Sequence, residues 1–382
     1  MKLPLVPGNR LELLDSGAAY FPRLIEALDA ARTEIFLETY IYADDATGAR
    51  VTEALGTAAR RGVRVHVTID GFGAREMPQR FRDELVASGA TLLVYRPPLW
   101  WHPVRGLRRM HRKLAVIDGA VAFVGGINII DDWNTPNEVP PRYDYSVRIE
   151  GPTVGQISAA ARHLWSVVAL TTFRRRELPP PLPLPAAAGT VAACLLTRDN
   201  LAHRRDIEDA YLDAIRAARH DVLLAIAYFL PSSGMLAALG DAASRGVRVR
   251  VLLQGNSDHA LLKRASEALY RRALAAGVTL IEYRKSFLHT KVGVVDDVWA
   301  TVGSSNLDPF SLLLSREANV VIVDTGFAAT LRGSIEAAIA SGGREVTLAD
   351  VVKAPWHLRL AQWAAYRFAR LVIDWLNIAH KN

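Results

Sequence analysis

The chain has 382 residues, of which 50% are hydrophobic and 22% charged, so it can bury a large core and fold as two domains or as two halves of one. Lysine and arginine number 46 against 39 aspartates and glutamates, and only seven of the basic residues are lysines. Guanidinium groups pair bidentately with phosphate. The composition therefore excludes a disordered chain and indicates an anionic partner, either lipid or nucleic acid.

The beginning of the chain, residues 1–17, carries charges and turn residues too early for the apolar core of a signal peptide. No stretch reaches the roughly 18 uncharged apolar residues that a membrane span needs. The single cysteine, Cys194, lies in an apolar run, and we expect it to be a small buried core residue. A protein with these features would act on a membrane from its surface.

An internal repeat organises the chain. The segment ALDAARTEIFLETYIY at 27–42 returns as AIRAARHDVLLAIAYF at 214–229, and later segments follow in the same order in both copies. Each copy predicts a helix, an apolar strand, a helix, an apolar strand, a helix, a strand and a strand pair. Strands that are almost continuously apolar are typical of a sheet covered by helices on both faces.

The repeat divides the chain into four segments. We expect a first α/β half at 1–173, a linker at 174–190, a second half at 191–342 and an amphipathic C-terminal helix within 343–382. The linker segment RRRELPPPLPLPAAAG is too rich in proline to form a helix or a central strand. Each half is predicted to contain its own mixed, largely buried sheet.

The first half holds about ten extra residues, in PPLWWHPVRGLRR, just before residue 111. Tryptophans suit the bilayer interface, and the neighbouring arginines suit anionic headgroups. The alternative is a buried tryptophan pair in a loop between the halves. The residues predicted to contact membrane or headgroups are Trp100, Trp101, Arg105, Arg108 and Arg109, with Leu99 and Arg112 beside them.

Two copies of one motif carry the chemistry, HRKLAVID at 111–118 and HTKVGVVD at 289–296. Residues two apart in a strand point to the same face, so the histidine and lysine of each copy should project together from a strand. The catalytic residues predicted from the motifs are His111, Lys113, Asp118, His289, Lys291 and Asp296. Within this set, the positions of Asp118 and Asp296 favour a turn or strand-end role over direct chemistry.

The motifs are followed by GGIN at 125–128 and GSSN at 303–306, in which small residues allow a close approach to ligand and the asparagines offer amide donors. The residues predicted to bind phosphate are Asn128, Asn306, Lys113 and Lys291. One histidine would attack phosphorus and the other would protonate the leaving alkoxide, giving two steps through a phosphohistidine. The carboxylates expected to orient the histidines are Asp144 and Glu317.

No metal or other cofactor is expected. A lysine two residues from each histidine repels a divalent ion, and no cluster of carboxylates accompanies the motifs. Lysines and asparagines supply the positive charge and the donors instead.

Residues 356–379 form an amphipathic pattern. At 100° per residue, one broad face carries Leu360, Ala364, Phe368, Leu371, Val372 and Trp375, and a narrow stripe carries Arg359, Arg367, Arg370 and Asp374, with Trp356 and Trp363 nearby. Such a helix lies in a membrane interface and does not span it. The alternative is a terminal helix packed on the protein's own core, and both can hold in part.

Together these residues resemble the phospholipase D superfamily, whose hallmark is two HxKxxxxD motifs, each followed by a G-G/S-x-N element. Almost the whole chain is similar to bacterial cardiolipin synthases of the short, B-type branch. The resemblance implies a bilobal fold with the active site between the halves, a phosphohistidine intermediate and no metal. It also implies that His111 is the nucleophile and His289 the general acid and then base. Ser315 departs from the asparagine of many relatives.

The resemblance further implies transfer of a phosphatidyl group from one phosphatidylglycerol to another with release of glycerol. It implies a peripheral enzyme on the cytoplasmic side of a bacterial membrane of phosphatidylglycerol and cardiolipin. Hydrolysis, transfer to phosphatidylethanolamine or a soluble polyol, a nuclease and a non-enzymatic membrane protein are the alternatives. The sequence offers no aromatic residues interleaved along a basic groove to stack on bases, as the nuclease alternative would require, so no nucleic acid is expected. The oligomeric state is not indicated.

Overall fold

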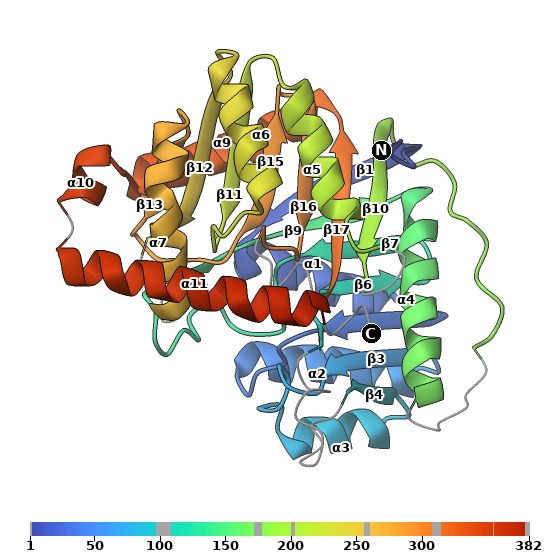
Figure 1. Cartoon of the computed structure of the whole chain (residues 1–382). Helices are drawn as coiled ribbons and strands as arrows, with labels where there is room; N and C mark the ends of the chain where they lie inside the picture. Colours follow the sequence, from blue (N-terminus) through green and yellow to red (C-terminus); the bar gives the residue numbers. More distant parts are fainter. Residues whose placement is uncertain are drawn as a thin grey trace.

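The computed structural model describes residues 2–96, 108–171, 178–199, 203–255, 260–307, 315–353 and 355–378. The chain forms two α/β halves that repeat the same order of elements and lie side by side (Figure 1). The repeat inferred from the sequence is confirmed. The fold class is the expected one, with helices covering a largely buried mixed sheet.

Equivalent elements of the two halves follow one another in the same order. The first half consists of β1 (Val6–Asp15), α1 (Ser16–Ala30), β2 (Glu34–Thr39), α2 (Ala46–Arg60), β3 (Arg64–Asp70), α3 (Gln79–Ala87), β4 (Thr91–Tyr95), β5 (Arg109–Met110), β6 (Leu114–Ile117), β7 (Val121–Gly125), β8 (Arg142–Tyr143), β9 (Tyr145–Glu150) and α4 (Thr153–Thr171). The second half consists of β10 (Val191–Arg198), α5 (Asp206–Ala217), β11 (Asp221–Ile226), α6 (Ser233–Ser244), β12 (Arg248–Gln254), α7 (Ala260–Ala275), β13 (Thr279–Tyr283), β14 (Phe287–Leu288), β15 (Lys291–Val295), β16 (Trp299–Gly303), β17 (Ser315–Val323) and α9 (Thr325–Gly342). The chain continues with β18 (Gly343–Glu345), α10 (Leu348–Val352) and α11 (Trp356–Ile378).

One continuous sheet runs through both halves. In the described part of the chain its order is β18-β13-β12-β11-β15-β16-β17-β10-β1-β9-β7-β6-β2-β3-β4. Separate sheets were expected, but the first strands of the halves, β1 and β10, pair antiparallel at the centre. This pairing removes two exposed strand edges. The buried Asn9 fixes the junction, because its side-chain nitrogen donates to the carbonyls of Val6 and Val191 at 2.6 and 3.0 Å.

Helices cover both faces of the sheet. A core cluster beneath α1, α2 and α3 serves the first half, and a second cluster beneath α5, α6 and α7 serves the second. A third cluster, which includes α4 and α9, contains residues of both halves. All six residues of β2 and all six of β11 are buried, which explains why the apolar residues in the middle of each strand are consecutive and do not alternate with polar ones. Cys194 is buried in β10, as expected.

The segment between the halves contains no helix or strand over its described residues, 178–190. It runs along one edge of the molecule (Figure 1). The Ala188 amide donates to the carbonyl of Gly8 at 2.8 Å, so the segment is tied to the start of β1. Its prolines leave few backbone donors for a sheet, in agreement with an extended course.

The C-terminal segment differs from the single helix expected within 343–382. Residues 343–345 form β18, which pairs antiparallel with β13, so the sheet of the second half extends beyond residue 342. A short helix follows, and Thr347 and Asp350 cap its start reciprocally. The last helix, α11, lies across α7 (Figure 1). Only this helix corresponds to the amphipathic pattern of the sequence.

Candidate active site

Each motif is tied to the opposite half of the molecule by the strand that precedes its histidine. β5 pairs parallel with β17, and the His111 amide then donates to the carbonyl of Arg316 at 2.9 Å. β14 pairs parallel with β8, and the His289 amide donates to the carbonyl of Tyr143 at 2.8 Å. These two connections between the halves occupy equivalent positions in the repeat. They bring the motifs together where the halves meet.

The histidines themselves lie just outside the strands in which we expected them. β6 begins at Leu114 and β15 at Lys291, so the histidine of each motif comes before the regular ladder. The reason is that the backbone of each histidine bonds across to the other half and is not available to its own sheet. The histidine and lysine still lie close together, at the start of the buried strand.

Each histidine is oriented by a carboxylate from the opposite half. Nδ1 of His111 lies 3.1 Å from Oε2 of Glu317, and Nδ1 of His289 lies 2.6 Å from Oδ2 of Asp144. An acceptor at Nδ1 holds the proton on that nitrogen and leaves Nε2 free to act as a nucleophile or base. Sequence reasoning found both carboxylates. That each one serves the histidine of the other half follows only from the structure.

Both motif lysines are buried beside the histidines. Lys113 is 3% exposed and donates to the His111 carbonyl at 2.7 Å, whereas Lys291 is fully buried and lies 3.6 Å from Asp144. Burial lowers the pKa of Lys113 well below its usual value, and Lys291 adds repulsion, while Glu317 opposes the shift. Burial likewise lowers the pKa of Lys291. An anion entering the site would raise the pKa of both amines and so favour their charged forms.

Burial also governs the protonation of the histidines. It lowers the pKa of His289 to about 3, Lys291 adds to the shift, and Asp144 opposes it. It lowers the pKa of His111, against the opposing effect of Glu317, and both lysines contribute. Burial raises the pKa of Asp144, but Lys291 and His289 outweigh burial and leave the pKa below its ordinary value. The site without substrate therefore favours neutral imidazoles and an ionised Asp144.

The two asparagines are buried in equivalent places but are bonded differently. Oδ1 of Asn128 accepts from the Ile41 amide at 3.0 Å, which leaves its NH₂ group to donate elsewhere. Oδ1 of Asn306 has no hydrogen-bond partner among the residues that the structure describes. The asparagines predicted to bind phosphate therefore differ in the groups that they offer to a ligand.

The residue after the first glycine of each G-x-x-N element also differs. A Cβ on Gly126 would lie 2.3 Å from Oδ1 of Asp144, so only glycine fits there. The equivalent Ser304 donates to Oε2 of Glu317 at 2.5 Å and accepts from the Ala318 amide at 3.0 Å. Ser304 was missed by sequence reasoning, although the change from GG to GS was its signal. Its hydroxyl and Nδ1 of His111 thus contact the same carboxylate oxygen of Glu317.

The motif aspartates are not brought together with the histidines. Asp118 accepts from the backbone amides of residues 32–34, and Asp296 accepts from those of residues 219–221. Both adopt positive φ, 51° and 49°, in the turn that follows their strand. Each fastens the loop before β2 or β11, the strand that pairs with its own. This placement agrees with the strand-end role favoured by their position and offers no direct contact with a reacting group.

Further residues that sequence reasoning missed support the histidines. The ring of Tyr40 packs edge-on against His111 at 4.9 Å, and Lys113 lies 5.3 Å from its centre. Asp70 accepts from the Met110 amide at 2.7 Å. Gln254, at the equivalent end of β12, accepts from the Leu288 amide at the same distance. The signal for Asp70 and Gln254 was that a polar residue ends the buried strand β3 or β12 at the same place in both copies of the repeat.

Arginines from both halves gather next to the site. Burial lowers the pKa of Arg108, and the nearby charges of Arg96, Arg204 and Arg316 lower it further, whereas Tyr95 opposes the shift. Arg109 stacks over Phe72 at 4.1 Å. A cluster of this kind suits an anionic headgroup. The other predicted headgroup residues, Trp100, Trp101 and Arg105, with Leu99, lie outside the described residues.

Arg112 corrects the prediction that it belongs with the headgroup arginines. Its side chain is 4% exposed and binds Glu38 bidentately at 2.7 and 2.8 Å. Because β2 lies beside β6, the guanidinium is directed into the core of the first half. The second half has Ala225 and Thr290 at these two places.

Ser315, the departure from the family pattern, pairs through its backbone with Arg109 and lies two residues before Glu317.

The described residues include no group of three or more histidine, cysteine, aspartate or glutamate side chains arranged to hold a metal ion. The helices in the described part of the chain all lack the combination of length and apolar composition needed to cross a membrane.

Comparisons with known proteins agree with the geometry. Residues 24–165 and 211–339 match the family described as cardiolipin synthase, PLD-like domain. Cardiolipin synthase B of Escherichia coli K12 is 38% identical over 98% of this chain and 92% of its own length. Cardiolipin synthase A of Pseudomonas putida is 30% identical over 86% of this chain and 67% of its own.

Solved structures support the fold. The phosphatidylserine synthase of Haemophilus influenzae Rd KW20 superposes with a TM-score of 0.73 at 14% identity, covering 97% of both chains. The polyphosphate kinase of Porphyromonas gingivalis superposes with a TM-score of 0.60 at 15% identity, covering 96% of this chain and 53% of its own. Because the family model matches a segment in each half of the chain and both motifs are in place, the chain belongs to the cardiolipin synthase family of phospholipase D-like enzymes.

Proposed function

We propose that the protein synthesises cardiolipin by transferring a phosphatidyl group from one phosphatidylglycerol to a second, with release of glycerol. The observation that carries this proposal is the crossed arrangement in which each histidine, 16% or 15% exposed, contacts a carboxylate of the opposite half, beside two buried lysines. Such a site has a nucleophile, an acid and a compensating positive charge for a phosphodiester. The similarity to cardiolipin synthase B over almost the whole chain supports the choice of substrate.

The first step would form a covalent intermediate. Nε2 of His111 donates its lone pair to phosphorus, the phosphorus–oxygen bond to the glycerol headgroup breaks, and His289 gives its proton to the departing glycerol oxygen. The products are glycerol and phosphatidyl-His111. The assignment of His111 as nucleophile follows the family resemblance, and the negative charge of the bound phosphodiester would favour protonation of His289 before the step.

The second step would reverse these roles. The terminal hydroxyl of a second phosphatidylglycerol attacks phosphorus while His289 accepts its proton, and the phosphorus–nitrogen bond to His111 breaks. Cardiolipin leaves, and both histidines return to their starting protonation states. Lys113, Lys291 and the amide groups of Asn128 and Asn306 would hold the non-bridging oxygens, most strongly when charge builds up in the transition state.

A lipid substrate is favoured over a nucleic acid. The arginines around Arg108 suit any phosphate, but the exposed apolar residues of the C-terminal helix suit a bilayer. Water in place of the second phosphatidylglycerol would give phosphatidic acid, and another alcohol would give a different phospholipid. Those outcomes remain the alternatives to cardiolipin synthesis.

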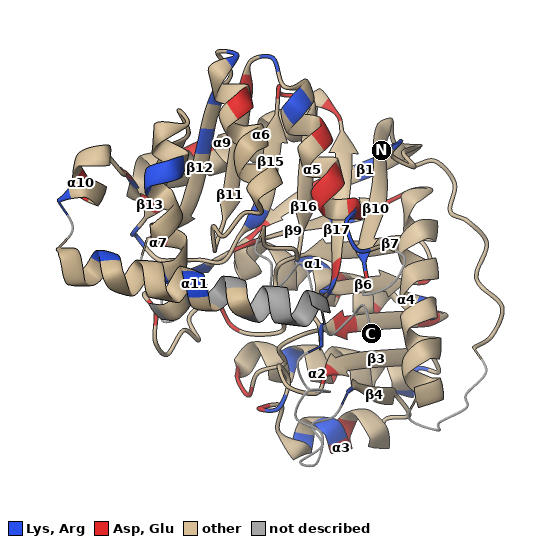
Figure 2. Ribbon diagram, in the orientation of Figure 1, with Lys and Arg blue, Asp and Glu red and all other residues tan. Residues whose placement is uncertain are grey.

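We further propose that α11 rests on an anionic membrane, on the cytoplasmic side of the bacterial cell. Its exposed apolar residues are Trp356, Leu360, Trp363, Phe368 and Leu371. Arg359 and Arg367 lie on the same exposed side, and basic residues are visible along the described part of the helix (Figure 2). The opposite side packs on α7, where Ala365 is buried with Leu269. Membrane contact and packing on the protein thus use different faces of one helix.

The proposed function is tested by incubating the purified protein with phosphatidylglycerol vesicles and separating the products by chromatography. Cardiolipin and glycerol in equal amounts are expected. The His111→Gln variant should form neither, whereas His163→Gln, which changes an exposed histidine on α4, should match the parent protein. Phosphatidic acid without cardiolipin would overturn transfer in favour of hydrolysis.

A further inference from the structure

A groove of about 290 Å³ lies between α7, α10 and α11 and shares none of the residues of the candidate active site. Arg271 and Arg272 enter it from α7, and Arg359 enters it from α11. Val352 of α10 and Trp363 of α11 supply apolar wall. The groove thus combines guanidinium groups with apolar side chains at the surface of the second half.

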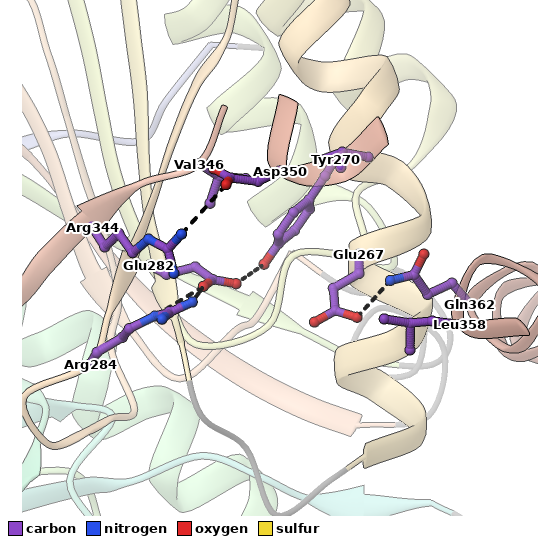
Figure 3. Close-up of a pocket in the computed structure, with 10 residues that line it drawn as sticks. Glu267, Tyr270, Glu282, Arg284, Arg344, Val346, Asp350, Leu358 and Gln362 are labelled. Carbon is purple, nitrogen blue, oxygen red and sulfur yellow. Dashed lines mark hydrogen bonds and ion pairs between the residues drawn. The ribbon is translucent and has the colours of Figure 1, made fainter. Parts of the chain in front are cut away.

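In a neighbouring pocket, by contrast, the arginines form ion pairs with the protein's own carboxylates. There Arg284 lies 2.6 Å from Glu282, and Arg344 lies 3.4 Å from Asp350 (Figure 3). Each arginine of that pocket already has a carboxylate. An anion entering there would have to compete with the protein's own acidic groups.

The groove arginines lack such partners. Among the described residues, no carboxylate lies within ion-pair distance of Arg271, Arg272 or Arg359. The acidic residue of the groove, Glu267, accepts instead from Gln362 at 3.0 Å and lies 3.8 Å from Lys263. Positive charge is therefore left without a carboxylate partner on both helices that form the groove; Figure 2 shows where basic residues occur on α7 and α11.

The apolar residues in the wall of the groove favour a lipid over a free anion as its ligand. Val352 is 58% exposed and Trp363 is 59% exposed, although both are large apolar residues. A small soluble anion would leave these surfaces in contact with water. An acyl chain would cover them, and covering a large apolar side chain contributes roughly 1.5 to 3 kcal/mol.

We propose that this groove binds one molecule of an anionic phospholipid. The phosphate of the headgroup lies among Arg271, Arg272 and Arg359, and the first part of an acyl chain runs along Val352 and Trp363. The inference rests on the proposed function, because it requires a protein that works at an anionic bilayer. It adds a lipid site separate from the two histidines, which holds the protein on the membrane and takes no part in the chemistry.

The beginning of α7 lies close to the residues that support the second motif. Lys263, in the first turn of α7, donates to the carbonyl of Gln254 at 3.3 Å. The side chain of Gln254 in turn accepts from the amide of Leu288, the residue before His289. A lipid held in the groove therefore fixes α7 to the membrane. The beginning of this helix contacts Gln254, which bonds to the residue before His289.

The test compares two variants with the same change of charge. Arg271→Gln/Arg272→Gln removes two groove charges, and Arg216→Gln/Arg219→Gln removes two exposed charges at the end of α5. Binding to vesicles of phosphatidylglycerol and phosphatidylcholine is measured by co-sedimentation at about 0.1 M salt. The groove variant should bind about 30-fold more weakly than the parent, since each basic residue near an anionic surface contributes about 1 kcal/mol, and the control should bind within about threefold.

A third variant, Ala268→Trp, fills the groove without changing its charge. It should weaken vesicle binding about tenfold if a lipid occupies the groove, whereas general attraction to surface charge would leave binding unchanged. Equal losses in the two arginine variants, or unchanged binding in Ala268→Trp, would overturn the site.

Turnover of soluble, short-chain phosphatidylglycerol separates this inference from the proposed function. All three variants should make cardiolipin from that substrate at the parent rate, because it needs no membrane. If the parent protein makes none, the proposed function fails. If the parent makes cardiolipin and the groove variants bind vesicles as well as the control does, only the lipid site fails.

Discussion

Replacing Asp144 by asparagine removes the negative charge that faces His289 while keeping the size of the side chain. In the structure Oδ2 of Asp144 lies 2.6 Å from Nδ1 of His289 and 3.6 Å from Nζ of Lys291. At an effective dielectric constant of about 20, unit charges 2.6 Å apart attract by about 6 kcal/mol. The amide of asparagine still accepts one hydrogen bond, and neighbouring groups relax. We therefore expect a loss of about 3 kcal/mol in the transition state, or roughly 150-fold in kcat.

The assay measures cardiolipin formation from short-chain phosphatidylglycerol under saturating conditions. KM should change little, because the carboxylate contacts the histidine and not the substrate. Glu150→Gln serves as the control, since Glu150 lies at the far end of β9, the strand that begins directly after Asp144, and pairs with Arg10 at the surface. Thermal melting establishes that both variants are folded. Activity of Asp144→Asn within about fivefold of the parent would refute the claim that a carboxylate of one half activates the histidine of the other.

Three further predictions follow from the same site. Burial lowers the pKa of His289 to about 3 from an ordinary 6.5, so the unfolded chain binds one more proton than the folded chain between these pH values, and the free energy of unfolding should fall by up to about 1.4 kcal/mol per pH unit as the pH decreases. In urea melts over this range, His289→Ala should show a weaker dependence of unfolding free energy on pH than the parent protein. An equal dependence would count against the buried neutral form. Gly126→Ala should reduce kcat more than tenfold, because the added Cβ would meet Asp144. The control, Gly333→Ala, lies on open helix surface and should keep its activity and raise the melting temperature. Equal activities of the two variants would mean that glycine is not needed at position 126. Activity should survive excess EDTA, since the positive charge comes from lysines, and loss that magnesium restores would contradict this.

The elements of the fold could be predicted because their signals are local. Apolar runs such as that of β11, all six residues of which are buried, record burial on both faces in the sequence itself. The repeat then fixed the order of the elements. The single sheet could not be predicted, because the pairing of β1 with β10 depends on how the halves meet, and neither strand reveals its partner.

The candidate site was predictable in its residues and not in its connections. The two HxK motifs, both asparagines and both carboxylates were found from spacing and resemblance. The crossing of Glu317 to His111 depends on β5 joining β17, a pairing of two residues between segments about 200 positions apart. Arg112 was misassigned for a similar reason, because its partner Glu38 is 74 residues away and its neighbours in sequence are basic.

The measurement that bears most directly on the account is the capture of the intermediate during turnover. The protein is mixed with phosphatidylglycerol, quenched in base, digested and analysed for modified histidine by mass spectrometry, with His289→Ala as a variant that should slow the breakdown of any intermediate that it forms. The account predicts an acid-labile phosphatidyl group on Nε2 of His111 in the parent protein. The same group on His289 would exchange the roles of the two halves, and an active protein that carries it on neither histidine would contradict the two-step mechanism.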